Sequence, residues 1–143
     1  MAQWVNNISD WELLARTLQA EAGNQGPEGM IAVGSVIMNR AGGDPRKIRD
    51  VILQRGQFSA WNSLTGYAGG EQGQDMENMQ PSDIAFTIAA NLINDKYNDP
   101  TGGATHYYNP TISSPAWGQA QAGGDWQQIG DHLFGNADAK RSG

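Results

Sequence analysis

The sequence has no cysteine and few charged residues. The absence of cysteine excludes a thiol nucleophile, a disulfide and a cysteine-ligated zinc site, and it leaves the cellular compartment undetermined. A chain of 143 residues can bury a core without such crosslinks, so we expect one domain over residues 1–143. Charged residues make up 17% and hydrophobic residues 38% of the chain, which indicates a packed globule.

Basic residues and long apolar runs are also scarce. Nine Lys and Arg against fifteen Asp and Glu give a net charge of -6, which disfavours nucleic acid as a partner. The longest apolar run, 30–38, is far shorter than the roughly 20 residues that span a bilayer. The first residues lack the pattern of a secretory signal. We therefore expect no membrane span and synthesis in the cytoplasm without a signal peptide.

Several catalytic motifs are missing as well. There is no Gly-x-Ser-x-Gly elbow, no phosphate loop and no Gly-x-Gly-x-x-Gly, which disfavours serine hydrolases, NTPases and dinucleotide enzymes. His106 and His132 lack the paired spacing typical of zinc ligands. A zinc amidase is therefore a weak alternative, and we expect no metal or cofactor.

The first predicted helix carries a carboxyl on its apolar face. Ser9 and Glu12 match a capping box, which predicts a helix that begins directly after Ser9. Leu14 and Leu18 follow at helical spacing, and the next member of that series is Glu21. A carboxyl thus interrupts an apolar stripe.

Three further helices are expected. A helix opening near Pro27 is apolar nearly all round, which indicates a buried central helix, and Gly34 within it suggests close approach of another backbone. Short helices are predicted after Asp44 and after Ser82, with an irregular segment at 62–80 between them.

Near the end of the sequence, the helical patterns give way to patterns typical of short strands. A short strand is predicted over 104–108 and a tight hairpin over 127–134, while 136–143 is expected to be a tail. The predicted fold class is α+β, a mostly helical single domain with a small C-terminal β element.

Glu21 is the strongest catalytic candidate. It lies between two alanines at the end of an apolar face, where poor solvation raises a carboxyl pKa from about 4.3 toward 6 or beyond and so suits a general acid. The alternative is a structural carboxyl paired with Arg16 or Arg40. Glycosidases usually need a second carboxylate, and no other acidic residue is marked for that role.

Aromatic side chains gather in polar, irregular segments rich in Asn and Gln. Sugar-binding clefts are built from such residues, although each aromatic alone is more typical of a side chain that bridges core and surface. The group comprises Trp61, Tyr67, Tyr107, Tyr108, Trp117 and Trp126.

Five motifs stand in one order over about residues 11–134. They are Ala20-Glu21-Ala22, Glu28 through Arg40, Gln57-Phe58-Ser59, Gly103-Ala104 with Tyr107-Tyr108-Asn109-Pro110, and Ile129 through Phe134. In this order they resemble the SleB-like cell wall hydrolase family, typified by a spore-cortex-lytic enzyme.

The resemblance implies a lysozyme-like, lytic-transglycosylase-like domain that cuts peptidoglycan glycan strands between N-acetylmuramic acid and N-acetylglucosamine. In that reaction one carboxyl acts as acid and then as base, leaving 1,6-anhydro ends. The resemblance therefore implies that Glu21 needs no second carboxylate and no cofactor.

By the same resemblance, Tyr108 and Asn109 would lie beside Glu21 and orient the acid and the sugar. Gln57 and Ser59 would line the same cleft. These assignments follow from matching motif positions.

Further residues are assigned by the resemblance. Trp61 and Trp117 are candidate sugar platforms, and Tyr107 is counted with the substrate-binding residues. Tyr107 stands where the family commonly has Phe, and Gly135 where an aromatic is frequent; both departures are expected to affect packing and to leave Glu21 untouched. Other matched positions are interpreted as architecture around the site: Asn39, Arg40, His132 and Phe134.

The expected setting is a phage or prophage endolysin, a monomer that reaches the wall through a holin, because no signal peptide or peptidoglycan-binding repeat is evident. A trimmed piece of a secreted enzyme would look the same. Two functional alternatives stay open: a hydrolytic muramidase on the same fold, and a non-catalytic peptidoglycan-binding module.

Overall fold

The computed structural model describes residues 2–68, 74–111 and 126–136. Helices occupy most of the first range, the second range holds α6 and β1, and three short strands form one sheet. The elements are α1 (Gln3–Asn7), α2 (Asp10–Ala22), α3 (Gly26–Arg40), η1 (Pro45–Lys47), α4 (Ile48–Ile52), η2 (Ser59–Trp61), α5 (Asn62–Thr65), α6 (Asp83–Ile93), β1 (His106–Tyr108), β2 (Gln127–Ile129) and β3 (His132–Gly135).

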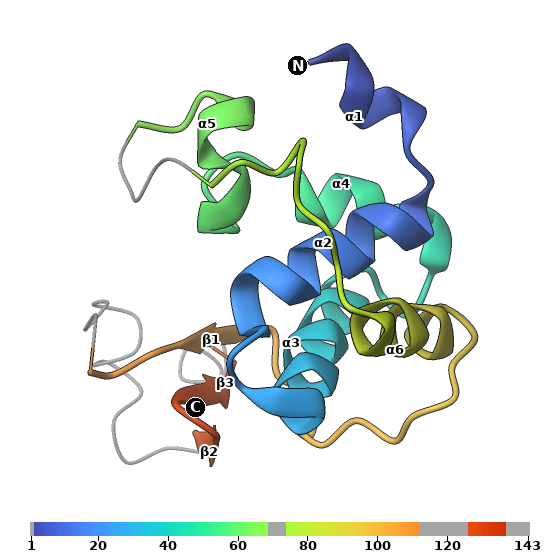
Figure 1. Cartoon of the computed structure of the whole chain (residues 1–143). Helices are drawn as coiled ribbons and strands as arrows, with labels where there is room; N and C mark the ends of the chain where they lie inside the picture. Colours follow the sequence, from blue (N-terminus) through green and yellow to red (C-terminus); the bar gives the residue numbers. More distant parts are fainter. Residues whose placement is uncertain (1, 69–73, 112–125, 137–143) are drawn as a thin grey trace.

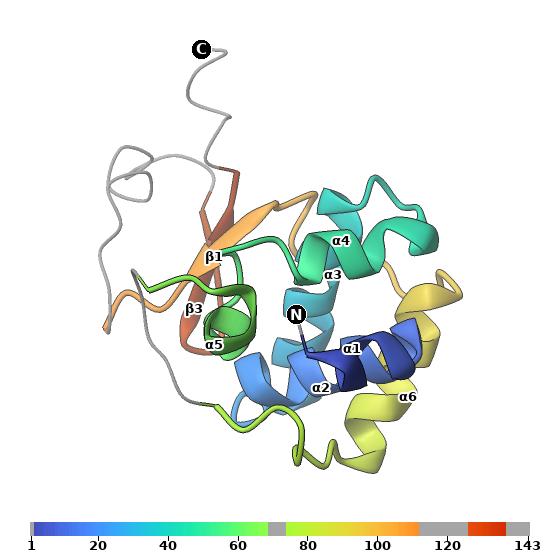
Figure 2. The same cartoon turned by 90° about the horizontal axis from the view of Figure 1, so that it is seen from above.

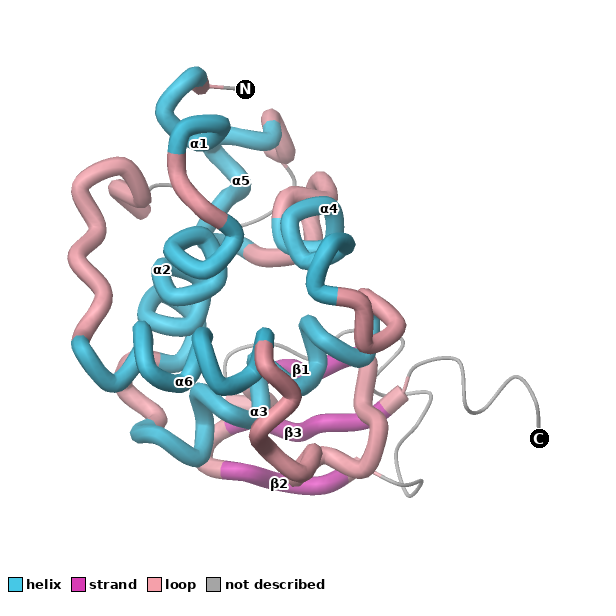
Figure 3. The backbone as a smooth tube through the Cα atoms, turned by 90° about the vertical axis from the view of Figure 1, so that its right-hand side faces the viewer, coloured by secondary structure: helices cyan, strands magenta, loops and turns pink. Residues whose placement is uncertain are grey.

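Helix α3 is the centre of the arrangement. It lies between the sheet and α6 in both Figure 1 and Figure 2, and it also packs against α2 and α4. The sheet is antiparallel with the order β1-β3-β2 and lies at the opposite end of the molecule from α1 (Figure 3). The predicted α+β fold, mostly helical with a small C-terminal β element, is confirmed.

The sequence signals at the helix starts are confirmed, with one correction. The Ser9 hydroxyl accepts a hydrogen bond from the Glu12 amide, and Ser82 accepts one from Ala85 at the start of α6. The Glu12 carboxylate, however, accepts from the Arg16 guanidinium (Nε at 2.9 Å). Only half of the expected capping box is present, because a full positive charge is a stronger partner than a backbone amide.

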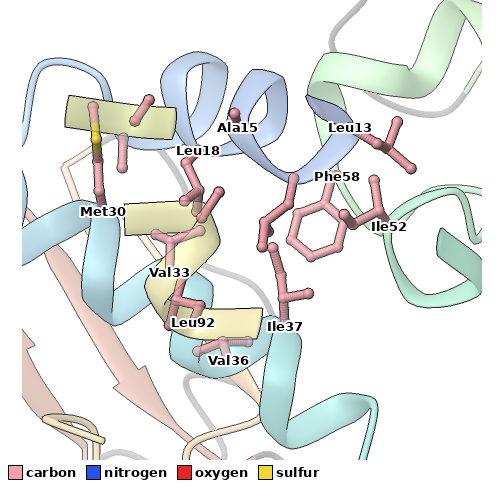
Figure 4. Packing of buried hydrophobic residues seen from close by; sticks show 14 of the residues in the cluster. Leu13, Ala15, Leu18, Met30, Val33, Val36, Ile37, Ile52, Phe58 and Leu92 are labelled. Atoms are coloured by element: carbon pink, nitrogen blue, oxygen red, sulfur yellow. The ribbon is translucent and has the colours of Figure 1, made fainter. Parts of the chain in front are cut away.

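The core is formed where the apolar faces of α2, α3 and α6 meet (Figure 4). Gly34 lies at the contact of α3 with α6, where a Cβ would come within 2.2 Å of Leu92 Cδ1. The expected close approach to Gly34 is therefore made by a side chain and not by another backbone. Within the described residues, no helix combines the length and apolar character needed to cross a membrane.

The β element agrees with the expected strand and hairpin, whereas the segment after α4 does not agree with its prediction. Strand β3 pairs with both neighbours, with Phe134 opposite Tyr107 and opposite Gln127. Helices η2 and α5 extend over 59–65, whereas an irregular segment was expected from residue 62. These helices contain too few apolar residues to show a helical period, so the sequence pattern does not predict them.

Asp99 ties the segment before β1 to the end of α3. Its carboxylate accepts hydrogen bonds from Asn39 Nδ2 (2.8 Å), from the amide and hydroxyl of Thr101 (2.8 and 2.6 Å) and from the Gly103 amide (2.8 Å). Partial burial acts to raise the pKa of Asp99, but the donors on Thr101, Asn39 and Gly103 outweigh it and lower that pKa below its usual 3.8. The turn 99–103 is thus fixed by one ionised side chain.

We expect the Gly34→Ala substitution to destabilise the protein by about 1–2 kcal/mol. The helix-propensity gain of up to about 1 kcal/mol is smaller than the overpacking cost against Leu92. Urea unfolding measures the change, and Leu92→Ala is the matched background. With Leu92 truncated, Gly34→Ala should be neutral or stabilising; equal destabilisation in both backgrounds would contradict the packing argument.

We expect Asp99→Asn to lower the free energy of unfolding at neutral pH by about 1–2 kcal/mol, a modest value because Asp99 is partly exposed. Since the folded-state pKa is depressed, the stabilisation is present above the unfolded-state value of about 3.9 and is lost as pH falls through the folded-state pKa. Melting temperatures of the two proteins should therefore converge as the pH falls through the folded-state pKa of Asp99. Asp95→Asn, an exposed residue at φ 55°, is the charge-matched control and should change little at any pH.

Candidate active site

Glu21 lies in the last turn of α2, half-buried, and each of its carboxyl oxygens accepts a hydrogen bond. The Tyr107 hydroxyl donates to Oε1, and the Ala60 amide donates to Oε2 at 3.3 Å. The donors come from β1 and from η2. The carboxyl is therefore the point at which the helical part, the segment after α4 and the sheet meet.

The indole of Trp61 fixes η2 against α2. Its Nε1 donates to Thr17 Oγ1 at 3.0 Å, and Thr17 in turn donates to the Leu13 carbonyl. Thr17 and Glu21 are one helical turn apart on the same face, so this bond brings the Ala60 amide within reach of Glu21. Trp61 is only 1% exposed, which corrects its assignment as a sugar platform, because a ring enclosed by the core has no face to offer a sugar.

Two aromatic side chains of β3, those of His132 and Phe134, contact the ring of Tyr107. The Phe134 ring stacks on it at a centroid distance of 5.5 Å, and His132 meets it edge-on at 5.1 Å. Burial lowers the pKa of His132 from its usual 6.5, and the charge of Asp131 only partly opposes this. His132 Nδ1 is buried and has no hydrogen-bond partner within the described residues. Tyr107 therefore packs against a ring whose environment favours its neutral form.

Burial and the neighbouring carboxyl both keep Tyr107 protonated. Burial raises the pKa of Tyr107 well above its usual 10.0, and the charge of Glu21 and the hydrogen bond to it raise that pKa further. The Arg40 guanidinium acts in the opposite direction. Arg40 is itself partly buried, which lowers its own pKa, and its interaction with Tyr107 opposes that shift. The phenol is thus a permanent donor to Glu21.

Of the two tyrosines of β1, the structure shows Tyr107 in contact with Glu21. Successive side chains of a strand point to opposite faces; Tyr107 contacts Glu21, while the Tyr108 ring meets Trp126 edge-on at 5.5 Å. Tyr107 was counted with the substrate-binding residues, and its departure from the family's Phe was expected to leave Glu21 untouched; the hydrogen bond to Glu21 shows that this last expectation is wrong. The amide oxygen of Asn109 accepts from the Thr111 amide and hydroxyl, at 2.9 and 2.6 Å, so it holds a local turn.

The remaining expected site residues are only partly brought together. Ser59 begins η2 and directly precedes Ala60, which places its backbone next to Glu21. Gln57 is exposed, and its amide donates to the Gln54 carbonyl at 3.1 Å. Trp117 lies outside the described residues.

Some groups that form the site carry no sequence signal. The Ala60 donor is a backbone amide, which any residue type except proline would supply. Gln25 exchanges two hydrogen bonds with Asp131, Nε2 to Oδ2 at 3.0 Å and the Asp131 amide to Oε1 at 2.9 Å. A glutamine in a turn is too common to reveal such a contact. These two bonds hold the β2–β3 hairpin against the end of α2 that carries Glu21.

The glycine at 135 has a packing reason. A Cβ on Gly135 would lie 2.5 Å from Trp126 Cδ2, so the Trp126 ring fills the space of a side chain at 135. This agrees with the expectation that the departure at this position affects packing. In the described ranges, His, Asp and Glu side chains form no group of three that could hold a metal ion.

Comparison with known proteins identifies a matching family and similar sequences. Residues 24–135 match the Cell Wall Hydrolase family. The spore cortex-lytic enzyme of Halalkalibacterium halodurans is 29% identical over 130 residues, 90% of this chain and 35% of the relative. The spore cortex-lytic enzyme of Bacillus subtilis is 32% identical over 130 residues, 88% of this chain and 37% of the relative. The chain thus spans little more than a third of these relatives.

Two solved structures resemble this fold. One is the catalytic domain of the germination-specific lytic transglycosylase SleB from Bacillus anthracis, with a TM-score of 0.67, 26% identity, and coverage of 92% of this chain and 98% of that chain. The other is the catalytic domain of Bacillus cereus SleB, with a TM-score of 0.63, 26% identity and 89% coverage of both. The resemblance found in the motifs is confirmed. Since the family match extends over most of the chain, the protein belongs to the cell wall hydrolase family.

Proposed function

We propose that this protein cleaves the glycan strands of peptidoglycan between N-acetylmuramic acid and N-acetylglucosamine as a lytic transglycosylase, with Glu21 as its acid and base. The observation that carries the proposal is a half-buried carboxyl with a donor on each oxygen, in a fold similar to the catalytic domain of a lytic transglycosylase. The family match begins at residue 24, so the support for Glu21 is its geometry.

In the proposed reaction, Glu21 donates one proton to the glycosidic oxygen and later accepts one from the C6 hydroxyl. The protonated Glu21 gives its proton to the glycosidic oxygen as the bond from that oxygen to muramic C1 breaks. The C6 hydroxyl of the muramic residue then attacks C1 and returns its proton to Glu21, closing the 1,6-anhydro ring. No water is consumed. Between the two steps Glu21 is a carboxylate, the form that the donors on Tyr107 and Ala60 stabilise.

A single-carboxyl mechanism agrees with the state of several other acidic residues in the described ranges. A retaining or inverting glycosidase would need a second carboxylate about 5–9.5 Å from the first and available to the sugar or to water. Six acidic side chains are already held by partners of their own: Asp10, Glu12, Asp44, Asp75, Asp99 and Asp131.

We expect Glu21→Gln to lower the rate of peptidoglycan cleavage at least 10²–10⁴-fold, because the amide keeps the shape of the side chain and cannot transfer the proton. The assay is turbidity loss of purified vegetative sacculi and of spore cortex fragments. Glu28→Gln, an exposed carboxyl in the first turn of α3, is the matched control and should keep its activity. A folded Glu21→Gln protein with undiminished cleavage would remove Glu21 from the mechanism.

Mass spectrometry of the released muropeptides separates the reaction types. Anhydromuramic ends, which borohydride cannot reduce, are expected. Reducing ends, heavier by one water molecule, would instead identify a hydrolytic muramidase on the same fold. Binding to sacculi without any release would identify a non-catalytic module. Delivery through a holin stays a separate prediction from the sequence.

A further inference from the structure

Tyr107 is fixed in place against Glu21 from several directions. Its hydroxyl donates to Glu21 Oε1. Its ring is covered by Phe134, which is also its partner in the β1–β3 register, and by the edge of His132. His132 and Phe134 also meet each other, at 6.0 Å, so the three rings form one cluster and a change of the Tyr107 rotamer would break its contacts with both residues of β3. The direction of the hydroxyl is therefore set by the sheet.

We infer that Tyr107 is a positioning residue for Glu21, whose hydroxyl holds the carboxyl in one orientation and stabilises the carboxylate that exists between the two proton transfers. The inference rests on the proposed function of Glu21. A donor with a fixed direction limits the carboxyl to one rotamer, so that the other oxygen is presented to the substrate at a constant place.

The phenol is suited to this role because it cannot replace Glu21 as the acid. Its pKa is raised by burial and by the charge of Glu21, so it keeps its proton while Glu21 loses and regains one. Arg40 opposes that rise. A nearby positive charge polarises the phenol O–H and makes it a stronger donor to the carboxylate. Arg40 therefore acts on Glu21 through Tyr107.

The charged and titratable groups around the pair come from α3 and from the β2–β3 hairpin. They are Arg40 at the end of α3, His132 on β3 and Asp131 in the hairpin turn; η2 contributes the Ala60 amide. Removal of the Tyr107 hydroxyl substitutes none of these residues. A shift in the titration of Glu21 on its removal would thus report the lost hydrogen bond.

The test is Tyr107→Phe, with Glu21 followed by isotope-edited NMR and its signal assigned by its disappearance in Glu21→Gln. Loss of a donor to the charged form should raise the pKa of Glu21 by about one unit. Because the acid must be protonated, the alkaline limb of the pH–rate profile should move to higher pH by the same amount, and the plateau rate should fall about tenfold.

The matched control is Tyr97→Phe, at a residue that follows α6; it removes a phenol hydroxyl that accepts from Asn91 of α6 at 3.1 Å. It should change neither the titration nor the profile. A folded Tyr107→Phe protein in which the pKa of Glu21 is unchanged or lower overturns the inference.

A second measurement needs no change at Tyr107. In the unaltered protein, the ring signal of Tyr107 should follow the ionisation of Glu21, and Glu21→Gln should abolish that inflection; a ring signal that ignores Glu21 overturns the inference. Cleavage retained by Glu21→Gln would defeat the proposed function while leaving the measured coupling intact, so the two failures are distinguishable.

Discussion

The hydrogen bond from Tyr107 to Glu21 joins the sheet of this protein to its helices. Together with the bond from the Ala60 amide, it requires β1, α2 and η2 to meet at one carboxyl, although these elements lie far apart in the chain. Three polar anchors between distant segments meet that requirement: Trp61 to Thr17, Gln25 to Asp131, and Asn39 to Asp99. Loss of any one of these hydrogen bonds would loosen the hold on an element that meets the others at Glu21.

The division between apolar core and polar anchors follows from the nature of the two interactions. Burial of apolar surface is non-directional, so it can pack α2, α3 and α6 together without fixing the sheet to within a fraction of an ångström. Hydrogen bonds weaken steeply with poor geometry, and they can set that position. The sheet contributes few residues to the core, Phe134 among them, and so depends on the anchors most.

The helices could be predicted from the sequence because their signals are local. A capping serine such as Ser9 or Ser82 and a proline near a helix start act through neighbouring residues, and the periodicity that follows fixes the buried face. The site could be predicted only as far as Glu21. Which tyrosine faces it depends on strand register, and the burial of Trp61 depends on its distant partner Thr17. Neither relation exists within a short window of sequence.

The two donors on Glu21 differ in what a substitution can change. The Ala60 amide belongs to the backbone, so the bond to Oε2 does not depend on the side chain at 60 as long as the residue is not proline and fits the buried position, which keeps η2 in place. The Tyr107 bond depends on a side chain, and Arg40 and His132 act on that side chain. The C-terminal end of α2 disfavours a negative charge on Glu21, whereas both donors favour it. In the proposed reaction a proton leaves Glu21 and returns to it, which needs this opposition, and of the two donors only the Tyr107 hydroxyl can be removed by changing one side chain.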